Sequence, residues 1–547
     1  MQSILLRYAT LALSLLLCII SLTHFSWHDV SCWVALATGV LTSIGFYDII
    51  QTKRSILRNY PILAHLRFFF ESIRPEIRQY FLEDDASENP FSRDQRSIVY
   101  QRAKQQLDKR PFGTQLHLYQ TGYEWIGHSI IPAKVDTHDF RITIGSTRAQ
   151  PYSASIFNIS AMSFGALSAN AIRALNQGAK IGNFMHDTGE GSISTYHKPE
   201  GNAVTGGDLV WEIGSGYFGC RHPDGTFDEK KFIVNAQLSQ VKMIEVKLSQ
   251  GAKPGHGGLL PGAKVSAEIA LARGVQEGVD CVSPASHSAF STPVELLQFV
   301  DKLRTLSGGK PTGFKLSVGH PWEFFSIAKA MLATGLLPDF IVIDGGEGGT
   351  GAAPVEFSDH VGTPLQEALL LVHNTLTGCN LREHIKLGAS GKIITAFDIT
   401  RTLALGADWC NSARGFMFAL GCIQSQSCHT DRCPTGVATQ DPHKQKALFV
   451  PDKAQRVAHF HLNTLKALAE LIAAAGLSHP DQLRPHHIIR RISHDQVKPA
   501  SLLLTYLKPG QLLATPTEHG TPSTPLPELY ATYWPLASAT SFQAIQL

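Results

Sequence analysis

The chain has 547 residues, of which 44% are hydrophobic and 17% charged, and its formal net charge is +3. This length accommodates a large core with accessory regions, and the composition is that of a globular protein with a modest membrane share. A net charge this small, without an arginine-rich arm, excludes an electrostatic nucleic-acid-binding protein. The nine cysteines form no visible disulfide framework, which favours a reducing compartment.

The N-terminus carries two uncharged apolar stretches, Tyr8–Phe25 and Val30–Tyr47. Each is about long enough to cross a hydrocarbon core as a helix, so we expect a transmembrane helical hairpin over residues 1–50. A cleaved signal peptide and a buried hairpin of a soluble protein are the alternatives. Basic residues follow the second stretch and none stands in the link, which predicts an inner (cytoplasmic) membrane protein with a cytoplasmic catalytic domain. Residues 51–150 are expected to form a membrane-proximal helical or accessory region.

From about Ser153 the sequence alternates short apolar runs with helical patterns. Eight runs end in glycine or small polar residues, at 155–163, 183–189, 243–249, 280–286, 313–319, 340–346, 385–391 and 408–414. Eight buried strands alternating with helices predict an α/β fold, a (β/α)8 TIM barrel over 151–445, with a doubly wound open sheet as the alternative. The insertion at about 191–242 is expected to form a cap or lid. A helical region is expected at 446–510 and a flexible tail at 511–547.

Polar residues suited to a binding mouth stand at the ends of these runs. They are Ser163, Glu190, Lys247, His287, Lys315, Asp344, Ser390 and Arg414. In such barrels active sites form at the C-terminal ends of the strands. The seventh and eighth runs, KLGASGK (386–392) and CNSARG (410–415), close with small residues before a helix, where backbone N–H groups can cradle a phosphate. A phosphate-bearing ligand, flavin mononucleotide (FMN) or a sugar phosphate, is implied.

Three cysteines, Cys422, Cys428 and Cys433, follow the eighth run with the spacing C-x5-C-x4-C. Structural zinc sites favour closely paired cysteines and need a fourth ligand, which His429 is poorly placed to supply. A cysteine-ligated iron–sulfur cluster fits better. Zinc and chemically inert cysteines remain as alternatives.

Four motifs stand in one order across about residues 150–445. They are HDTGEGS (186–192), KLSQGAKPGHGGLLPG (247–262), DGGEGGTGAAP (344–354) and CIQSQSCHTDRCPTGVATQ (422–440). Together they resemble the FMN-binding synthase domain of the glutamate synthase large subunit, whose three cysteines hold a 3Fe–4S cluster. The chain looks like a membrane-anchored, stand-alone form of that domain.

The resemblance implies a role for each matching residue. FMN would lie at the barrel mouth, where a cation such as Lys315 suits the negative charge that reduced flavin gathers near N1 and the C2 carbonyl. The residues expected to contact it are Ala161, Met162, Ser163, Lys315, Asp344, Gly346, Gly388, Ser390, Gly391, Lys392, Arg414 and Gly415. Lys315 and Glu190 would be catalytic. Cys422, Cys428 and Cys433 would ligate the cluster.

The substrate implied by the resemblance is 2-oxoglutarate, a dianion. Lys247, Gln250 and Lys253 supply two positive charges and an amide on one short loop. For Lys247 and Glu190 the alternative is pairing with a neighbouring opposite charge at a strand end. For His287 the alternative to an acid role is a histidine at the barrel mouth whose hydrogen-bonding groups are already paired.

Several positions depart from the family pattern. His256 replaces the usual glutamate, Glu347 stands where aspartate is typical, and Gln2 stands where the family's glutaminase domain has its nucleophilic cysteine. The family's C-terminal β-helix is also not recognised. We therefore expect the chain to take ammonia from outside, from a glutaminase or another ammonia-supplying partner.

The expected activity is the reductive amination of 2-oxoglutarate to glutamate, with FMN and a 3Fe–4S cluster as cofactors. No GxGxxG element stands in a strand–helix context, so the electrons would come from an external donor. One alternative is an FMN oxidoreductase acting on a different acid or amine, for example in N-methylglutamate formation. The other is a non-catalytic, membrane-tethered electron-transfer module.

Overall fold

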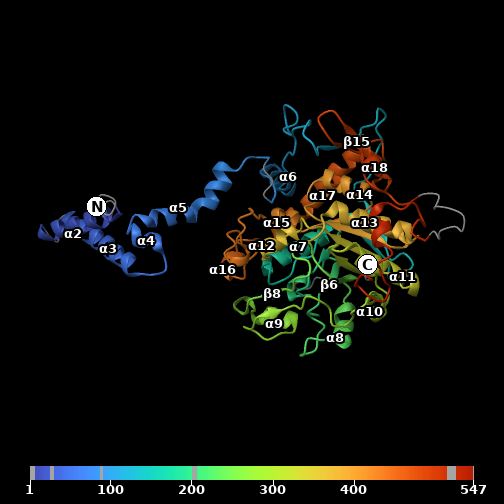
Figure 1. Ribbon diagram of the computed structural model, residues 1–547, viewed down its shortest axis with the longest axis horizontal. Coiled ribbons are helices and arrows are strands. Elements are labelled where there is room, and N and C mark those ends of the chain that lie inside the picture. Colours follow the sequence, from blue (N-terminus) through green and yellow to red (C-terminus); the bar gives the residue numbers. More distant parts are fainter. Residues whose placement is uncertain (1–6, 25–29, 87–89, 200–205, 514–524, 546–547) are drawn as a thin grey trace. The chain divides into compact units, whose positions relative to one another are not determined.

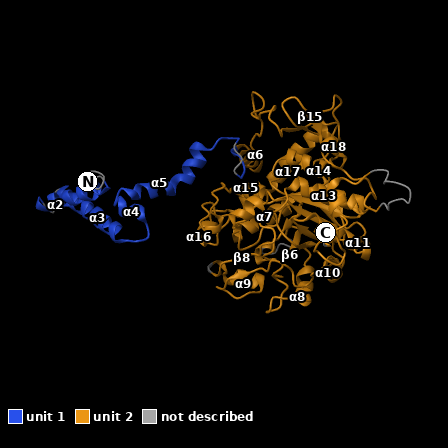
Figure 2. Ribbon diagram, viewed as in Figure 1, with its two compact units in different colours: residues 1–93 blue, residues 94–547 orange. Residues whose placement is uncertain are grey.

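The computed structural model describes residues 7–24, 30–86, 90–199, 206–513 and 525–545 (Figure 1). The chain forms two compact units, Met1–Arg93 and Asp94–Leu547 (Figure 2).

The first unit contains two apolar helices that pack against each other, α2 (Ala9–Thr23) and α3 (Val30–Ile50). Ser14 Oγ of α2 donates to Thr38 O of α3 at 3.2 Å and lies 2.6 Å from Thr42 Oγ1. Within the described residues, α3 is the one helix long and apolar enough to cross a membrane, whereas α2 has 15 residues. The first expected span is therefore shorter than predicted, and the link at 25–29 lies outside the described residues.

The rest of the first unit is helical. After α3 come α4 (Ser55–Asn59), α5 (Ala64–Ile77) and a π-helical turn, η1 (Arg78–Leu82).

The second unit is built on a closed barrel of eight parallel strands. These are β4 (Phe157–Ile159), β5 (His186–Asp187), β6 (Leu209–Ile213), β7 (Val241–Lys247), β10 (Thr312–Leu316), β11 (Phe340–Asp344), β12 (Lys386–Ser390) and β13 (Trp409–Ser412). The last strand pairs with the first, with Asn411 opposite Asn158, and so closes the ring. The predicted (β/α)8 TIM barrel is confirmed.

Helices surround the barrel (Figure 1). The longer ones are α7 (Ala169–Gly182), α8 (Glu229–Ala236), α10 (Pro293–Leu306), α11 (Pro321–Thr334), α13 (Leu365–Gly378), α14 (Ala396–Ala404) and α17 (Val450–Ala474). Local sequence explains their ends. Thr292 and Glu295 form a capping box at the start of α10, and Gly335, at φ 70°, ends α11 in the left-handed conformation. Gly178 lets α7 meet α17, because a Cβ there would lie 2.4 Å from Val457 Cγ1.

Further elements complete the second unit. They are α6 (Arg93–Ala103), α9 (Ala267–Arg273), α12 (Val355–His360), α15 (Arg414–Leu420), α16 (Pro442–Gln445), α18 (Ala500–Leu503) and α19 (Glu528–Tyr533). An antiparallel sheet joins β1 (Glu124–Ile126) to β14 (Ile488–Arg491) and β15 (Val497–Pro499). Residues expected in a flexible tail include α19, whose buried Tyr530 ring lies 5.5 Å from the ring of Phe325.

Two strand predictions were wrong. The run at 280–286 does not enter the barrel: β9 (Cys281–Val282) pairs antiparallel with β8 (Leu259–Leu260), and Val282 is exposed. The third barrel strand is instead β6, which lies in the segment expected to be a lid. All five residues of β6 are buried. Its fourth residue, Glu212, interrupts the apolar pattern, because that side chain points into the barrel.

The barrel interior is layered. A hairpin of β2 (Arg141–Ile144) and β3 (Tyr152–Ser155) packs its apolar side chains against residues near the start of the barrel strands. The resulting cluster is Ile144, Tyr152, Ala154, Met185, Val210, Met243, Phe340, Val342 and Trp409. Side chains of a strand alternate between faces, so residues two positions further along face the same interior. Those residues include Asp187, Glu212 and Glu245, and the apolar layer is therefore followed by a charged one.

Candidate functional site

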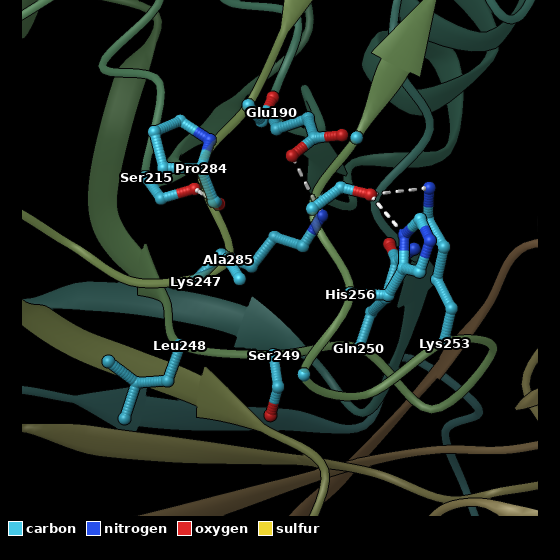
Figure 3. Close-up of a pocket in the computed structure, with 14 residues that line it drawn as sticks. Glu190, Ser215, Lys247, Leu248, Ser249, Gln250, Lys253, His256, Pro284 and Ala285 are labelled. Atoms are coloured by element: carbon cyan, nitrogen blue, oxygen red, sulfur yellow. Dashed lines mark hydrogen bonds and ion pairs between the residues drawn. The ribbon is translucent and has the colours of Figure 1, made fainter.

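A cleft of about 360 Å³ opens beside the C-terminal ends of the strands (Figure 3). Its lining is largely polar. It comprises Glu190, Ser215, Lys247, Leu248, Ser249, Gln250, Lys253, Gly255, His256, Gly257, Gly258, Ser283, Pro284 and Ala285. The structure thus brings Glu190 together with all three residues expected to bind the substrate.

Glu190 and Lys247 form an ion pair on one wall of the cleft, with Lys247 Nζ 3.0 Å from Glu190 Oε2 (Figure 3). Burial raises the pKa of Glu190, but Lys247, Arg273 and Lys253 outweigh it and lower the pKa to about 2. Glu190 is therefore an ionised carboxylate at physiological pH. The pairing that the sequence left open as an alternative for these two residues is present.

Lys253 has a different environment. Its Nζ donates to Gly257 O at 3.2 Å, and His256 donates to the same oxygen from Nδ1 at 2.6 Å. Among the described residues no carboxylate lies within 4.0 Å of Lys253 Nζ. Burial lowers the pKa of Lys253 below its usual value, with attraction from Glu190 opposing it and repulsion from Lys247 adding to it. Lys253 is thus the half-buried cation of the cleft without an ion-pair partner.

His287 and Tyr217 support the strand end that carries Lys247. His287 Nε2 donates to Lys247 O at 2.8 Å, and Tyr217 Oη donates to His287 Nδ1 at 3.0 Å and accepts from Ala289 N at 3.1 Å. Burial lowers the pKa of His287 to about 4, so the ring is neutral. His287 is therefore a histidine at the barrel mouth whose two ring nitrogens both have hydrogen-bond partners. The supporting role of Tyr217 was not anticipated from the sequence.

The loops expected to hold a cofactor meet at the same end of the barrel. Asp344 Oδ2 accepts from Gly251 N at 2.8 Å, and a Cβ on Gly251 would lie 1.8 Å from Gly345 O. The loop after β7 and the loop after β11 therefore touch backbone to backbone, which requires glycine. Ser390 Oγ lies 3.3 Å from Ser160 Oγ, across from β12 to the end of β4.

The loop after β4 contains Ala161 and buried Met162, and it packs against Gly189, where a Cβ would lie 2.9 Å from Met162 C. Ser163 Oγ accepts from Gly191 N at 3.2 Å, next to Glu190. On the other side, Arg414 donates to Glu347 O at 2.7 Å, and Gly346 donates its N–H to Thr363 O at 2.9 Å. Apart from Gly388, the expected contact residues therefore lie on or next to the loops of one rim.

The loop after β12 fits a phosphate. Lys392 adopts φ 51°, in the left-handed region, and within the described residues the N–H groups of Gly391 and Lys392 have no hydrogen-bond partner. Gly415, at the start of α15, approaches Ser412 so closely that a Cβ would lie 2.6 Å from its Oγ. Free N–H groups of this kind bind anions. Gly388 is different: it lies inside the strand, against the Trp409 ring, and does not reach the mouth.

The cysteine loop fits a thiolate-ligated cluster. Several of its residues are left-handed, including Gln424 at φ 61° and Gln426 at φ 55°, and Gln424 N donates to Cys422 Sγ at 3.5 Å. Burial raises the pKa of Cys422 to about 12, so the free thiol is protonated at neutral pH, and a ligated metal would have to replace that proton. Burial also raises the pKa of Cys433, but hydrogen bonds from Thr435 and backbone N–H groups outweigh it and lower that pKa. N–H groups directed at sulfur are typical of iron–sulfur sites.

Lys315 lies just beneath this rim, in the charged layer. Its Nζ contacts Glu212 Oε2 and lies 3.4 Å from Glu245 Oε1. Burial would lower the pKa of Lys315, but Glu212, Glu245, Asp187 and Asp344 raise it well above its usual value. The lysine is a permanent cation. The sequence analysis missed the acidic partners, although the E-x-K spacing of MIEVKLS shows two charges facing one side of a strand.

Comparison with known proteins gives the family. The conserved region of glutamate synthase matches residues 123–478. The chain is 37% identical over 500 residues to the glutamate synthase large subunit-like protein YerD of Bacillus subtilis, covering 84% of this chain and 94% of YerD. The chain belongs to the glutamate synthase family. The predicted resemblance is confirmed, and the protein is an oxidoreductase acting on CH–NH2 donors.

Other members of the glutamate synthase family match the barrel region. The archaeal glutamate synthase (NADPH) of Methanocaldococcus jannaschii is 37% identical over 329 residues, 60% of each chain. The glutamate synthase (NADPH) large chain of Bacillus subtilis is 33% identical over 331 residues, which cover 60% of this chain and 20% of that one.

The Glu190–Lys247 pair predicts a specific pH dependence of stability. Because the pKa of Glu190 is lowered on folding to about 2, its contribution is present above the unfolded value near 4.5 and is lost as pH falls toward 2. Glu190→Gln should lower the free energy of unfolding by up to about 3 kcal/mol at neutral pH. Denaturant titrations should show this difference shrinking below about pH 4.5. The exposed carboxylate variant Glu277→Gln is the control, and a difference that is constant with pH would contradict the assignment.

Proposed function

We propose that this protein reductively aminates 2-oxoglutarate to glutamate, with FMN and a 3Fe–4S cluster as cofactors and ammonia supplied from outside. The observation that carries the proposal is the half-buried Lys253, which has no carboxylate partner among the described residues and lies in a cleft beside the ionised Glu190–Lys247 pair. A desolvated cation of this kind favours a carboxylate ligand. Family membership supplies the class of reaction.

The chain's own residues bind and orient the reactants. Lys253 and Gln250 lie on one loop and would receive a carboxylate of the keto acid, while His287 fixes the backbone of Lys247. Ionised Glu190 attracts ammonium, the cationic form of the nitrogen donor. With a pKa of about 2 it is too weak a base to keep the ammonium proton, so Glu190 acts as an electrostatic anchor.

FMN would be held by the loops of the barrel rim. The unpartnered N–H groups of Gly391 and Lys392 suit its phosphate, and Ser163, Asp344 and Arg414 lie on neighbouring loops. Held there, FMN would supply the hydride chemistry of the reduction, at the C2 carbon of the substrate. Lys315 supports this from below as a permanent cation near the place where negative charge would gather.

The cysteine loop would hold the cluster next to the flavin loops. A Cβ on Gly351, which belongs to the loop after β11, would lie 3.9 Å from Cys428 Cβ. A cluster bound by Cys422, Cys428 and Cys433 supplies one-electron transfer. Because the cysteine loop lies next to the flavin loops, electrons from an external donor could pass through the cluster to the flavin.

The first unit would anchor the protein in the cytoplasmic membrane. Helix α3 has 21 residues and at 1.5 Å per residue is about 32 Å long, enough for a hydrocarbon core of about 30 Å. Its outward side chains Trp33, Leu36 and Val40 are exposed and apolar. Lys53, Arg54 and Arg58 follow it, which supports a cytoplasmic catalytic unit.

A second candidate keeps the cofactors and changes the amine. His256 lies at the rim of the cleft, with its ring 5.1 Å from the Phe357 ring in an edge-on contact. An aromatic rim offers apolar contact to the methyl group of an alkylamine, which a rim carboxylate would not. Methylamine offered in place of ammonia distinguishes the two activities.

Lys253→Gln tests the substrate assignment. Losing one charge-assisted contact costs about 1.5–3 kcal/mol, so the Kd of 2-oxoglutarate should rise roughly ten- to a hundredfold while FMN content stays unchanged. Perturbation of the flavin spectrum measures binding. Lys134→Gln, at a solvent-exposed lysine paired with Asp136, is the matched control. Failure of 2-oxoglutarate to bind the natural protein would exclude the glutamate-forming reaction.

The cluster assignment predicts loss of iron from cysteine variants. Replacing Cys422, Cys428 or Cys433 by Ser should abolish the iron–sulfur absorbance and the turnover with an external donor, since each thiolate would be a ligand. FMN should remain, because its loops are separate. Cys379→Ser, at a buried cysteine outside the loop, is the control. Full iron content in all three variants would rule out a cluster at this loop.

Membrane anchoring predicts a graded effect of truncation. Deleting residues 1–50 should release the protein from membranes with its flavin, whereas deleting 1–29, which keeps α3, should not. Fractionation after a high-salt wash measures this. A C-terminal tag should be protected from protease in spheroplasts, and its digestion would reverse the proposed orientation.

A further inference from the structure

The charged layer inside the barrel contains more acid than base. Asp187, Glu212 and Glu245 come from three neighbouring strands, and Lys315 enters from β10. All four side chains are buried. One carboxylate oxygen from each acid lies within 4.8 Å of those from the others. The ammonium of Lys315 contacts Glu212 and is 3.4 Å from Glu245, so the cation that such a group of acids requires is already present.

Charge balance cannot be reached with all four groups ionised. Three carboxylates and one ammonium would leave two uncompensated negative charges away from water, which costs several kcal/mol per ion. Carboxylates this close share protons instead. Glu245 Oε1 makes no hydrogen bond within the described residues, although Lys315 is its ion-pair neighbour, so it is an acceptor still able to take one.

The other groups around the layer do not supply the missing positive charge. Gly189 N donates to Asp187 Oδ1 at 2.9 Å, and Asp344 of β11 adds a further acid near Lys315. Of the bases above the layer, Lys247 is paired with Glu190, and Arg414 interacts with Asp344 and Glu347. The remaining strands contribute neutral polar groups, which are Ser160, Ser390 and Asn411. Protons are therefore what balances the layer.

We propose that Asp187 and Glu245 hold an exchangeable proton in the barrel interior, which the layer takes up when negative charge is placed above Lys315 and releases when that charge leaves. The proton comes from solvent and returns to it. One carboxyl O–H bond forms and breaks, and these residues transfer no electrons. Asp187 and Glu245 do not touch the reactants. They act as positioning residues that adjust the net charge around Lys315.

The titration of the two acids supports this assignment. Burial and repulsion from Glu212 raise the pKa of Asp187 to about 7, and burial with repulsion from Asp187 raises the pKa of Glu245 well above its usual value. The layer therefore exchanges a proton in the neutral range, where a small change of charge nearby shifts its occupancy.

Infrared difference spectroscopy of the full chain tests the proton directly. The C=O stretch of a protonated carboxylic acid should decline with a midpoint near pH 7 in the natural protein. Asp187→Asn should abolish this transition, and Lys315→Met should move it to higher pH. Glu277→Gln, at an exposed carboxylate, is the matched control and should leave it unchanged. A natural protein without a titrating band, or a band that persists in Asp187→Asn, would overturn the proposal.

Glu245→Gln provides a second variant should Asp187→Asn not fold. A stability readout accompanies it: because the pKa of Asp187 is raised on folding, its contribution is complete below about pH 4 and is lost as pH rises through about 7. Asp187→Asn or Glu245→Gln should flatten this dependence of the unfolding free energy. A slope retained by both variants would contradict the assignment.

The coupling to redox chemistry rests on the proposed function. For a two-electron couple each coupled proton contributes about 30 mV per pH unit to the midpoint potential. Above pH 7 the flavin midpoint potential of the natural protein should fall with pH more steeply than that of Asp187→Asn. The difference in slope should be one such increment. Equal slopes would reject the coupling, while the infrared transition would still establish the proton. A protein that binds no flavin would refute the proposed function and leave the infrared result standing.

Discussion

The closure of the barrel is the constraint from which the rest of the molecule follows. Once β13 pairs with β4, every inward side chain must be accommodated by its neighbours in the ring, and the alternation of each strand decides which residues those are. Near the strand starts the solution is apolar packing, completed by the β2–β3 hairpin. In the next layer the inward side chains are the Lys315 ammonium and its carboxylate neighbours. At the rim, polar loops take their place.

The loops depend on glycine in the same strict way. Gly251 meets Gly345 backbone to backbone, and Gly351 brings its loop against Cys428. Substrate cleft, flavin rim and cysteine loop are therefore parts of one contact surface. A side chain inserted at these junctions would separate the loops that, under the proposed function, hold substrate, flavin and cluster.

The sequence predicts the barrel and most of the site, because strand ends, glycine loops and cysteine spacing are local patterns. It failed at β6 and at 280–286 for a common reason. An inward glutamate such as Glu212 makes a buried strand look polar. The apolar pair Cys281–Val282 makes a short hairpin outside the barrel look like a barrel strand. The Glu190–Lys247 pairing was foreseen only as an alternative. The acids around Lys315 were missed because a sequence shows charges along one strand, whereas their compensation lies across four.

The β2–β3 hairpin closes the bottom of the barrel, and this limits how small molecules reach the site. With Ile144, Tyr152 and Ala154 packed among the starts of the strands, the axis of the barrel offers no passage, and small molecules cannot thread it from below. Under the proposed function, keto acid, nitrogen donor and reducing equivalents would all arrive at the same face. A partner that delivers one of them would then compete for space with the others, and the order of binding would matter as well as each affinity.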